Sequence, residues 1–193
     1  MDGRVQRGAR NRQAVIDAHL ALLERGDLSP TAQAIAAEAG VSTRSVFHHF
    51  DDLESLFADT ADTLAARHWH LLQPVDAALP VEERVRLLVA QRAVLFERIT
   101  TTRRAAVVHE HDSPVLAKRL RESRAALRSH LRRNLAPEFT ALDRDTQAGL
   151  EAAASWESWE VLRRHQGLSV SAATRALTHL LHVSLRQTAT VGP

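Results

Sequence analysis

Residues 31–50, which read TAQAIAAEAGVSTRSVFHHF, predict two short helices joined by a tight turn. Thr31 and Ser42 are each placed to cap a helix, because a hydroxyl there accepts a hydrogen bond from a first-turn amide that lacks another partner. Gly40 suits a turn that needs a positive φ. The stretch therefore has the form of a helix-turn-helix, a motif that puts its second helix into a DNA groove.

The second of these helices has one apolar side and one polar side. Val46 and Phe50 repeat at helical spacing and are expected to face inward. The opposite side carries side chains that can bond base edges or phosphates, namely Thr43, Arg44, Ser45 and His48.

The longer run from Arg12 to Leu56 resembles the DNA-binding domain of the TetR family of bacterial transcription regulators. The shared features are an Ile/Val-x-x-Ala pattern, a Gly and then a Thr, an Ile-Ala pair, Ala-Gly-Val-Ser and a His-Phe pair. They fall at Val15 to Ala18, Gly26, Thr31, Ile35, Ala36, Ala39 to Ser42, His49 and Phe50.

The resemblance implies an all-helical protein with two domains. Residues 1–52 would form a three-helix DNA-binding domain with a basic N-terminal arm, and residues 53–193 a larger helical domain for effector binding and dimerisation. The residues expected to contact DNA are Arg4, Arg7, Arg10, Arg12, Thr31, Gln33, Thr43, Arg44, Ser45, Phe47, His48 and His49.

Three positions depart from the family pattern. Phe47 replaces a Tyr whose hydroxyl contacts phosphate, Leu53 replaces a Lys, and Arg44 replaces a Gly. Because counterion release ties affinity to the number of neutralised phosphates, losing the Lys should lower affinity and flatten its salt dependence. Arg44 can restore part of this affinity or read a guanine directly.

The N-terminal region has a net positive charge only over its first twelve residues. Residues 1–12 hold four Arg against Asp2, a net charge of +3, whereas residues 13–50 hold two Arg against four acidic side chains, a net of −2. We expect a basic arm that follows the DNA backbone or enters the minor groove. A disordered, solubilising tail is the alternative.

The composition excludes several protein classes. The 193 residues include no Cys, which excludes disulfides, Cys-based zinc sites and a thiol nucleophile. The sequence has neither the long apolar run of a transmembrane helix nor the apolar segment of a secretory signal. We expect a cytoplasmic protein that needs no cofactor and binds no membrane.

Beyond residue 52 the pattern predicts helices near 53–73, 81–101, 114–135, 144–166 and 171–188. Arg92 lies within an apolar stripe of the second of these. It is either a structural group or the partner of a carboxylate or polar group of an effector. Glu157 interrupts another stripe, and we hypothesise that the two charges compensate one another. The expected effector-binding residues are Trp69, Leu88, Arg92, Phe96, His111 and Glu157.

The last two predicted helices indicate an association surface. The final helix carries an apolar face, and the helix before it carries two Trp residues away from its main stripe. Two apolar faces on one helix exceed what one neighbour buries, which favours a homodimer; burial of both within the monomer is the alternative. The expected interface residues are Trp156, Trp159, Leu177, Leu180, Leu181 and Ser184.

Enzymatic activity is not expected, because the sequence holds no Gly-rich phosphate loop, nucleophile elbow or His-Glu-x-x-His pair. Residues 109–112, His-Glu-His-Asp, are interpreted as an inter-helix loop rather than a metal site, and the Arg-rich run 118–133 as a solvated helix face. The favoured function is a transcriptional repressor released from a palindromic operator on double-stranded DNA by a small-molecule effector. A helical scaffold protein and a helical metal-dependent enzyme stay open as alternatives.

Overall fold

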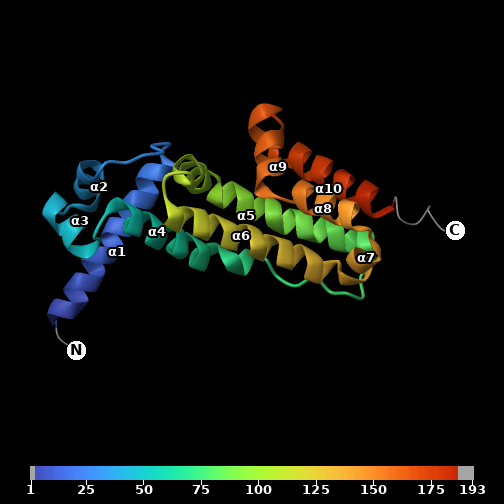
Figure 1. The fold of residues 1–193 in the computed structure, drawn as a ribbon, viewed down its shortest axis with the longest axis horizontal. Helices are drawn as coiled ribbons and strands as arrows, with labels where there is room; N and C mark the ends of the chain where they lie inside the picture. The colour runs from blue at the N-terminus through green and yellow to red at the C-terminus, as the bar shows by residue number, and fades with distance from the viewer. Residues whose placement is uncertain (1–2, 187–193) are drawn as a thin grey trace. The chain divides into compact units, whose positions relative to one another are not determined.

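The computed structural model describes the backbone of residues 3–186 and the side chains of residues 5–186, and every regular element in this range is helical (Figure 1). The all-α prediction is confirmed. No helix in the described range is long and apolar enough to cross a membrane. In chain order the elements are α1 (Gly3–Glu24), α2 (Ala32–Ala39), α3 (Thr43–His49), α4 (Leu53–His68), η1 (Trp69–Leu71), α5 (Val81–His109), α6 (Pro114–Asn134), α7 (Ala136–Ala141), α8 (Arg144–Ala153), α9 (Trp156–Glu160), η2 (Val161–His165) and α10 (Val170–Arg186).

The chain folds into two units that do not follow chain order. The first unit contains residues 1–68 and 99–122, and the second contains residues 69–98 and 123–193. Helices α5 and α6 therefore contribute residues to both units.

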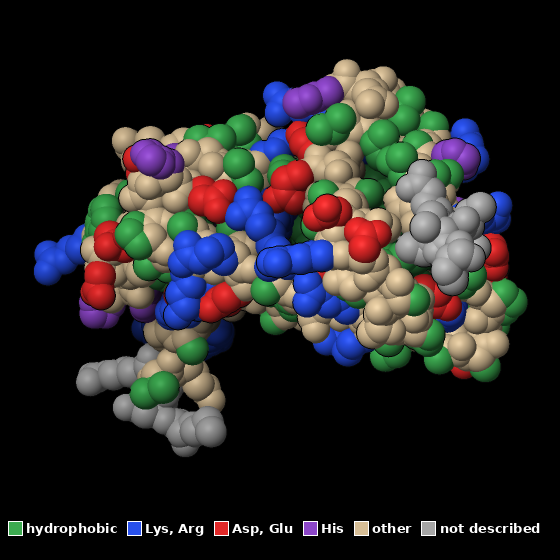
Figure 2. Space-filling model, turned by 45° about the vertical axis from the view of Figure 1, so that its right-hand side comes forward, with side chains coloured by type: hydrophobic (Ala, Val, Ile, Leu, Met, Phe, Trp, Pro, Cys, Tyr) green, Lys and Arg blue, Asp and Glu red, His purple; other side chains and the backbone are tan. Residues whose placement is uncertain are grey.

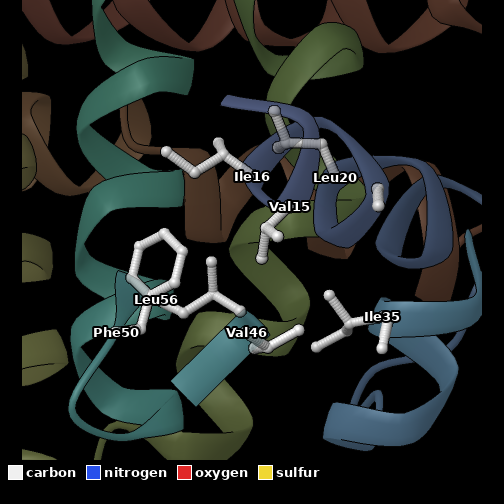
Figure 3. Packing of buried hydrophobic residues seen from close by; sticks show 9 residues of the cluster. Val15, Ile16, Leu20, Ile35, Val46, Phe50 and Leu56 are labelled. Carbon is white, nitrogen blue, oxygen red and sulfur yellow. The ribbon is translucent and has the colours of Figure 1, made fainter. Parts of the chain in front are cut away.

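The first unit is built on an apolar cluster at the meeting point of α1, α2, α3 and α4 (Figure 3). Val15, Ile35, Val46 and Leu56 come from the four helices in turn, and each is almost completely buried. Leu53 packs against this cluster, so the position that is Lys in the family pattern serves packing here.

Both predicted helix caps of the first unit are present. Thr31 Oγ1 accepts from the amide of Ala34 at 3.2 Å, and Ser42 Oγ accepts from the amide of Ser45 at 3.1 Å. Gly40 has a φ of 66°, as its place in the turn requires.

In the second unit, the predicted 144–166 helix is wrong, because the chain turns between α8 and α9. Ser155 begins a new helix there, and its Oγ accepts from the amide of Ser158 at 3.2 Å. A π-helical turn, η2, follows α9. Figure 1 shows α9 turned out of line with α8.

This turn also corrects four of the predicted interface residues. Trp156, Trp159, Leu177 and Leu181 are buried within the chain itself and present no surface to a second subunit. Because α9 leaves the direction of α8, the monomer buries both Trp side chains together with Leu177 and Leu181 of α10, and Trp159 packs on Phe96 with ring centroids 6.1 Å apart. Leu180, 46% exposed, and the half-buried Ser184 keep accessible surface.

Candidate nucleic-acid interface and effector cavity

Helix α3 separates its side chains into an inward and an outward set, as predicted. Val46 lies in the core at 1% exposure and Phe50 follows at 3%. The side chains of Thr43, Arg44, Phe47 and His48 are exposed, whereas those of Ser45 and His49 are half-buried.

The two capping hydroxyls and Gln33 lie on the same helix-turn-helix. Thr31 and Gln33 are exposed at the start of α2. The oxygens of Thr31 and Ser42 accept from backbone amides, so their O–H groups stay able to donate to phosphate oxygens.

The predicted basic arm is the first part of a helix, because α1 begins at Gly3. Arg7 and Arg10 are exposed on it, while the side chain of Arg4 lies outside the described side chains. Arg12 differs from them, because its guanidinium stands 5.0 Å from the centre of the Phe50 ring and forms an ion pair with Asp59.

His48 and His49 form a pair at the end of α3, with ring centroids 5.3 Å apart. Partial burial lowers the pKa of His49, and the nearby His48 and Arg12 lower it further. Protonation of His49 is therefore disfavoured at this end of α3.

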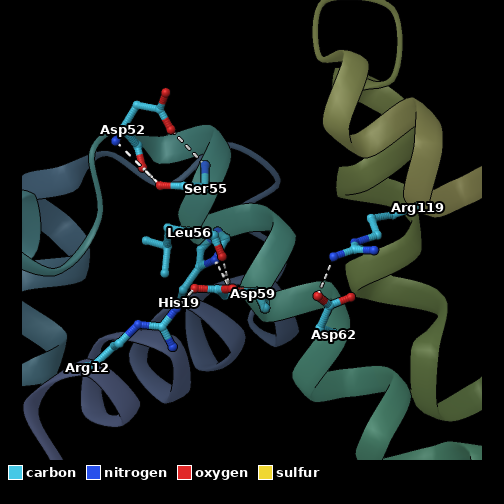
Figure 4. A network of polar contacts seen from close by, with 9 residues as sticks. Arg12, His19, Asp52, Ser55, Leu56, Asp59, Asp62 and Arg119 are labelled. Carbon is cyan, nitrogen blue, oxygen red and sulfur yellow. Dashed lines mark hydrogen bonds and ion pairs between the residues drawn. The ribbon is translucent and has the colours of Figure 1, made fainter. Parts of the chain in front are cut away.

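A polar network within the first unit joins α4 to its neighbours (Figure 4). His19 of α1 contacts Thr60 Oγ1 through Nδ1 at 2.8 Å, and the Thr60 hydroxyl donates to the carbonyl of Leu56 at 2.8 Å. The Thr60 hydrogen is thereby used, so Nδ1 of His19 is the donor and its buried Nε2 carries a lone pair without a partner in the described residues. Burial lowers the pKa of His19 to about 4.

The end of α5 and the start of α6 hold α4 from another side. Ser113 Oγ and the amide of Val115 both donate to Glu54 Oε1, at 2.6 and 3.2 Å, and Arg119 pairs with Asp62 at 2.6 Å. His109 is helical rather than part of a loop, which corrects the sequence prediction, and its Nε2 lies 3.3 Å from the carbonyl of Leu28. No three His, Asp or Glu side chains of the described residues are grouped as a metal site would require.

A cavity of about 270 Å³ lies in the second unit, among α5, α6, α8 and α9. Its apolar lining comes from Leu127 and Leu131 of α6 and Ala148 and Ala152 of α8. The rest of the lining is polar or charged and comprises Arg92, Arg124, Arg128, Glu151, Ser155 and Glu157.

Arg92 is fully buried beside this cavity. Its Nη1 donates to the carbonyl of Ala154 and its Nη2 to the carbonyl of Leu127, both at 2.6 Å. The predicted compensation between Arg92 and Glu157 is wrong, because Glu157 accepts from Arg124 Nε at 3.0 Å, while the partners of Arg92 within residues 5–186 are two backbone carbonyls.

The cavity brings together two of the six residues that were expected to bind an effector, Arg92 and Glu157. Leu88 and Phe96 are core residues that do not line it. Trp69 lies half-buried in η1, and His111 is exposed in the turn after α5, in the first unit. The Arg residues of α6 that line the cavity were missed, because their run reads as a solvated face. Basic side chains, nearly all of them arginines, lie interspersed with acidic ones on the face that Figure 2 shows.

Comparison with known proteins identifies the first unit's motif. Residues 15–60 match the model of a family described as bacterial regulatory proteins, tetR family. The sequence has no match among curated proteins.

Solved structures show the same fold. A transcriptional regulator from Rhodococcus sp. Rha1 gives a TM-score of 0.70 at 22% identity, over 96% of this chain and 99% of that one. A Mesorhizobium loti MAFF303099 protein ascribed to the TetR family of transcriptional regulators gives 0.65 at 19% identity, over 94% and 98%. The multidrug binding protein EbrR, complexed with imidazole, gives 0.58 at 18% identity, over 88% and 93%.

Proposed function

Because the chain belongs to the TetR family of bacterial regulatory proteins, we propose that it is a transcriptional repressor that binds a palindromic operator as a homodimer and is released by a small-molecule effector. The observation that carries this proposal is the two-sided character of α3. Its inward side chains complete the core, which leaves Arg44 and its exposed neighbours free to read base edges.

The homodimer is supported by the apolar surface left on α10. Leu180 and Val183 are 46% and 40% exposed on this helix. A two-fold dimer presents two copies of α3 at the spacing of successive major grooves, and its symmetry explains why the operator is a palindrome.

The effector is bound in the second unit, in the cavity beside Arg92. Release requires that the effector bind better to the dimer conformation whose two α3 helices do not match the operator. Helix α4 is the element that transmits the change, since it packs on the DNA-binding core and is held by Ser113 and Arg119 of the α5–α6 region. The protein acts in the cytoplasm, where bacterial DNA lies, and catalyses no reaction.

The proposal is tested by selecting bound sequences from random DNA and then measuring mobility shifts. We expect one palindromic consensus and a saturable complex that weakens with salt. A scaffold protein with an inactive helix-turn-helix would give neither, and that result would refute the proposal. Sedimentation at the working concentration tests the dimer.

Removal of residues 1–11 is expected to weaken binding to all DNA sequences and to reduce the slope of log affinity against log salt. Three arginines are lost, and each phosphate contact contributes about 0.9 to the slope, so the reduction is up to about 3. The double variant Arg7→Gln, Arg10→Gln is the control, because it removes charge without shortening α1. An unchanged slope in both would show that the arm is only a tail.

Phe47→Tyr is expected to tighten binding to all sequences by about 2- to 10-fold, the worth of one added hydrogen bond. Phe47 is 49% exposed on α3, and the added hydroxyl restores the phosphate contact typical of the family. Phe47→Leu, which adds no hydroxyl, is the matched control for mobility shifts at fixed salt. Equal affinities for Phe47→Tyr and the parent protein would contradict a phosphate-facing position.

A further inference from the structure

The charges around the effector cavity are unevenly compensated. Arg124 and Glu157 form one ion pair at 3.0 Å, and Arg128 lies 3.9 Å from Glu151, which also pairs with Arg132 outside the cavity lining. These groups keep contact with solvent. Arg92 is buried to 1% exposure, and no carboxylate of the described residues pairs with it. The deepest charge of the lining is thus a cation without a counter-ion.

Backbone carbonyls offset only part of this charge. Ala154 is the C-cap of α8, so its carbonyl lies at the negative end of a helix dipole worth about half an elementary charge. Leu127 offers a second carbonyl from within α6. The Nε–H of Arg92 is buried and donates to no group in the described residues. A buried donor in this state gains from any acceptor that reaches it.

The pKa values of Arg92 and of the nearby His130 are both lowered. Burial lowers the pKa of Arg92 to about 10. The pKa of His130 is lowered to about 4, first by burial and then by Arg92. His130 Nε2 donates to the carbonyl of Gln73, so it is Nδ1 that stays unprotonated near the guanidinium.

We propose that the effector is a small organic monocarboxylate whose carboxylate binds Arg92 and whose short apolar body lies against Leu127, Leu131, Ala148 and Ala152. This inference rests on the proposed function of the cavity and names its ligand class. One unpaired cation calls for one negative charge. The volume of about 270 Å³ lies just below the usual range of small-molecule pockets, about 300–1,000 Å³, which favours a small ligand.

Calorimetric titration of the full-length protein with matched probes tests the ligand class. Butanoate, hexanoate and octanoate are compared with hexan-1-ol, hexanamide and hexylamine, which keep the apolar body and change the head group. We expect binding of at least one carboxylate, at least 10-fold tighter than any neutral or cationic probe. Equal binding of the alcohol or the amine, or no binding of any carboxylate, would overturn the proposal.

Variants place the carboxylate at Arg92. Arg92→Met keeps the volume and removes the charge, and we expect about 10- to 100-fold weaker binding of the carboxylate that binds best. Arg121→Met is the matched control, since Arg121 is exposed on the same helix as Leu127 and does not line the cavity. Ala152→Leu fills the cavity while leaving Arg92 in place, and it should abolish binding of the carboxylate. This variant keeps the proposal testable if Arg92→Met fails to fold. Unchanged binding in Ala152→Leu would overturn the proposed position.

A spectroscopic measurement separates a bound carboxylate from a merely altered fold. Neutralisation of Arg92 by the carboxylate should raise the pKa of His130, which NMR follows through the imidazole protons. The effector role is tested separately by adding the same carboxylate to the protein–DNA complex. If the carboxylate binds at Arg92 without releasing DNA, the anion site stands and the repressor mechanism fails. If another compound releases DNA without displacing the carboxylate, the mechanism stands and the ligand class proposed here is wrong.

Discussion

Lowering the pH from about 6.5 to 4 is expected to destabilise the protein by about 3 kcal/mol for each of two buried histidines. The pKa values of His19 and His130 are lowered from 6.5 to about 4. In this range the unfolded chain binds a proton at each histidine and the folded chain does not. The stabilisation that each neutral histidine provides is therefore complete above about pH 6.5 and is lost as the pH falls from about 6.5 to 4. Urea unfolding at a series of pH values measures it.

The structure explains the size of this effect. Protonation of His19 at Nε2, or of His130 at Nδ1, would bury an N–H donor for which the described residues provide no acceptor. His19→Gln and His130→Gln should each flatten the pH dependence of the free energy of unfolding by about 1.4 kcal/mol per pH unit within this pH range. His179→Gln, on the exposed side of α10, is the control. If neither buried variant changes the slope, both histidines are protonated in the folded protein.

Arg44→Ala is expected to abolish discrimination at the operator position that Arg44 reads, at a loss of about 1–3 kcal/mol for the preferred base. Arg44 is exposed at the start of α3, and a guanidinium there can donate two hydrogen bonds to a guanine. Selection from random DNA with the variant should return a consensus in which that position has become degenerate, while the rest of the palindrome persists.

A control separates base reading from charge loss. Arg25→Ala also removes an exposed arginine from the first unit, one that pairs with Glu38 at 2.6 Å. It should leave the consensus unchanged. If Arg44→Ala instead weakens binding to every sequence equally and lowers the salt slope by about 0.9, then Arg44 contacts a phosphate and not a base.

Local patterns predicted the helix-turn-helix well, because its elements are fixed by neighbouring residues. The hydroxyl of Ser42 caps α3 through an amide only three residues away, and Gly40 adopts the φ that the turn needs. Leu53 packs against the same core as Leu56, and their shared helical stripe is visible in the spacing of the sequence.

Features that depend on tertiary packing were missed. Helix α5 continues past the three consecutive threonines at 100–102, whose β-branched side chains disfavour helix, because Ala105 and Ala106 are buried beyond them. The turn at Ser155 contains no Pro or Gly by which the sequence could predict it. Without that turn, the carbonyl that Arg92 binds at Ala154 could not be foreseen.

Arg92 itself was found because a charge in an apolar stripe is visible in any sequence, yet its partners were not. A carbonyl oxygen leaves no trace in the residue pattern, and Glu157 is the carboxylate that the apolar stripes bring to notice. Arg124, which actually pairs with Glu157, lies in a run whose charges suggest solvent on all sides.

The first unit is discontinuous in sequence, so the DNA-binding helices cannot be produced as one continuous N-terminal fragment without losing part of their support. A fragment that stops at residue 68 would keep α3 but lose residues 99–122, and with them Ala106, Leu116 and Leu120, against which Phe57 packs. Glu54 and Asp62 would lose Ser113 and Arg119 at the same time. A chimera that transfers this DNA specificity to another helical domain must therefore carry both residues 1–68 and residues 99–122. Otherwise the new domain must supply an equivalent apolar surface on which α4 can pack.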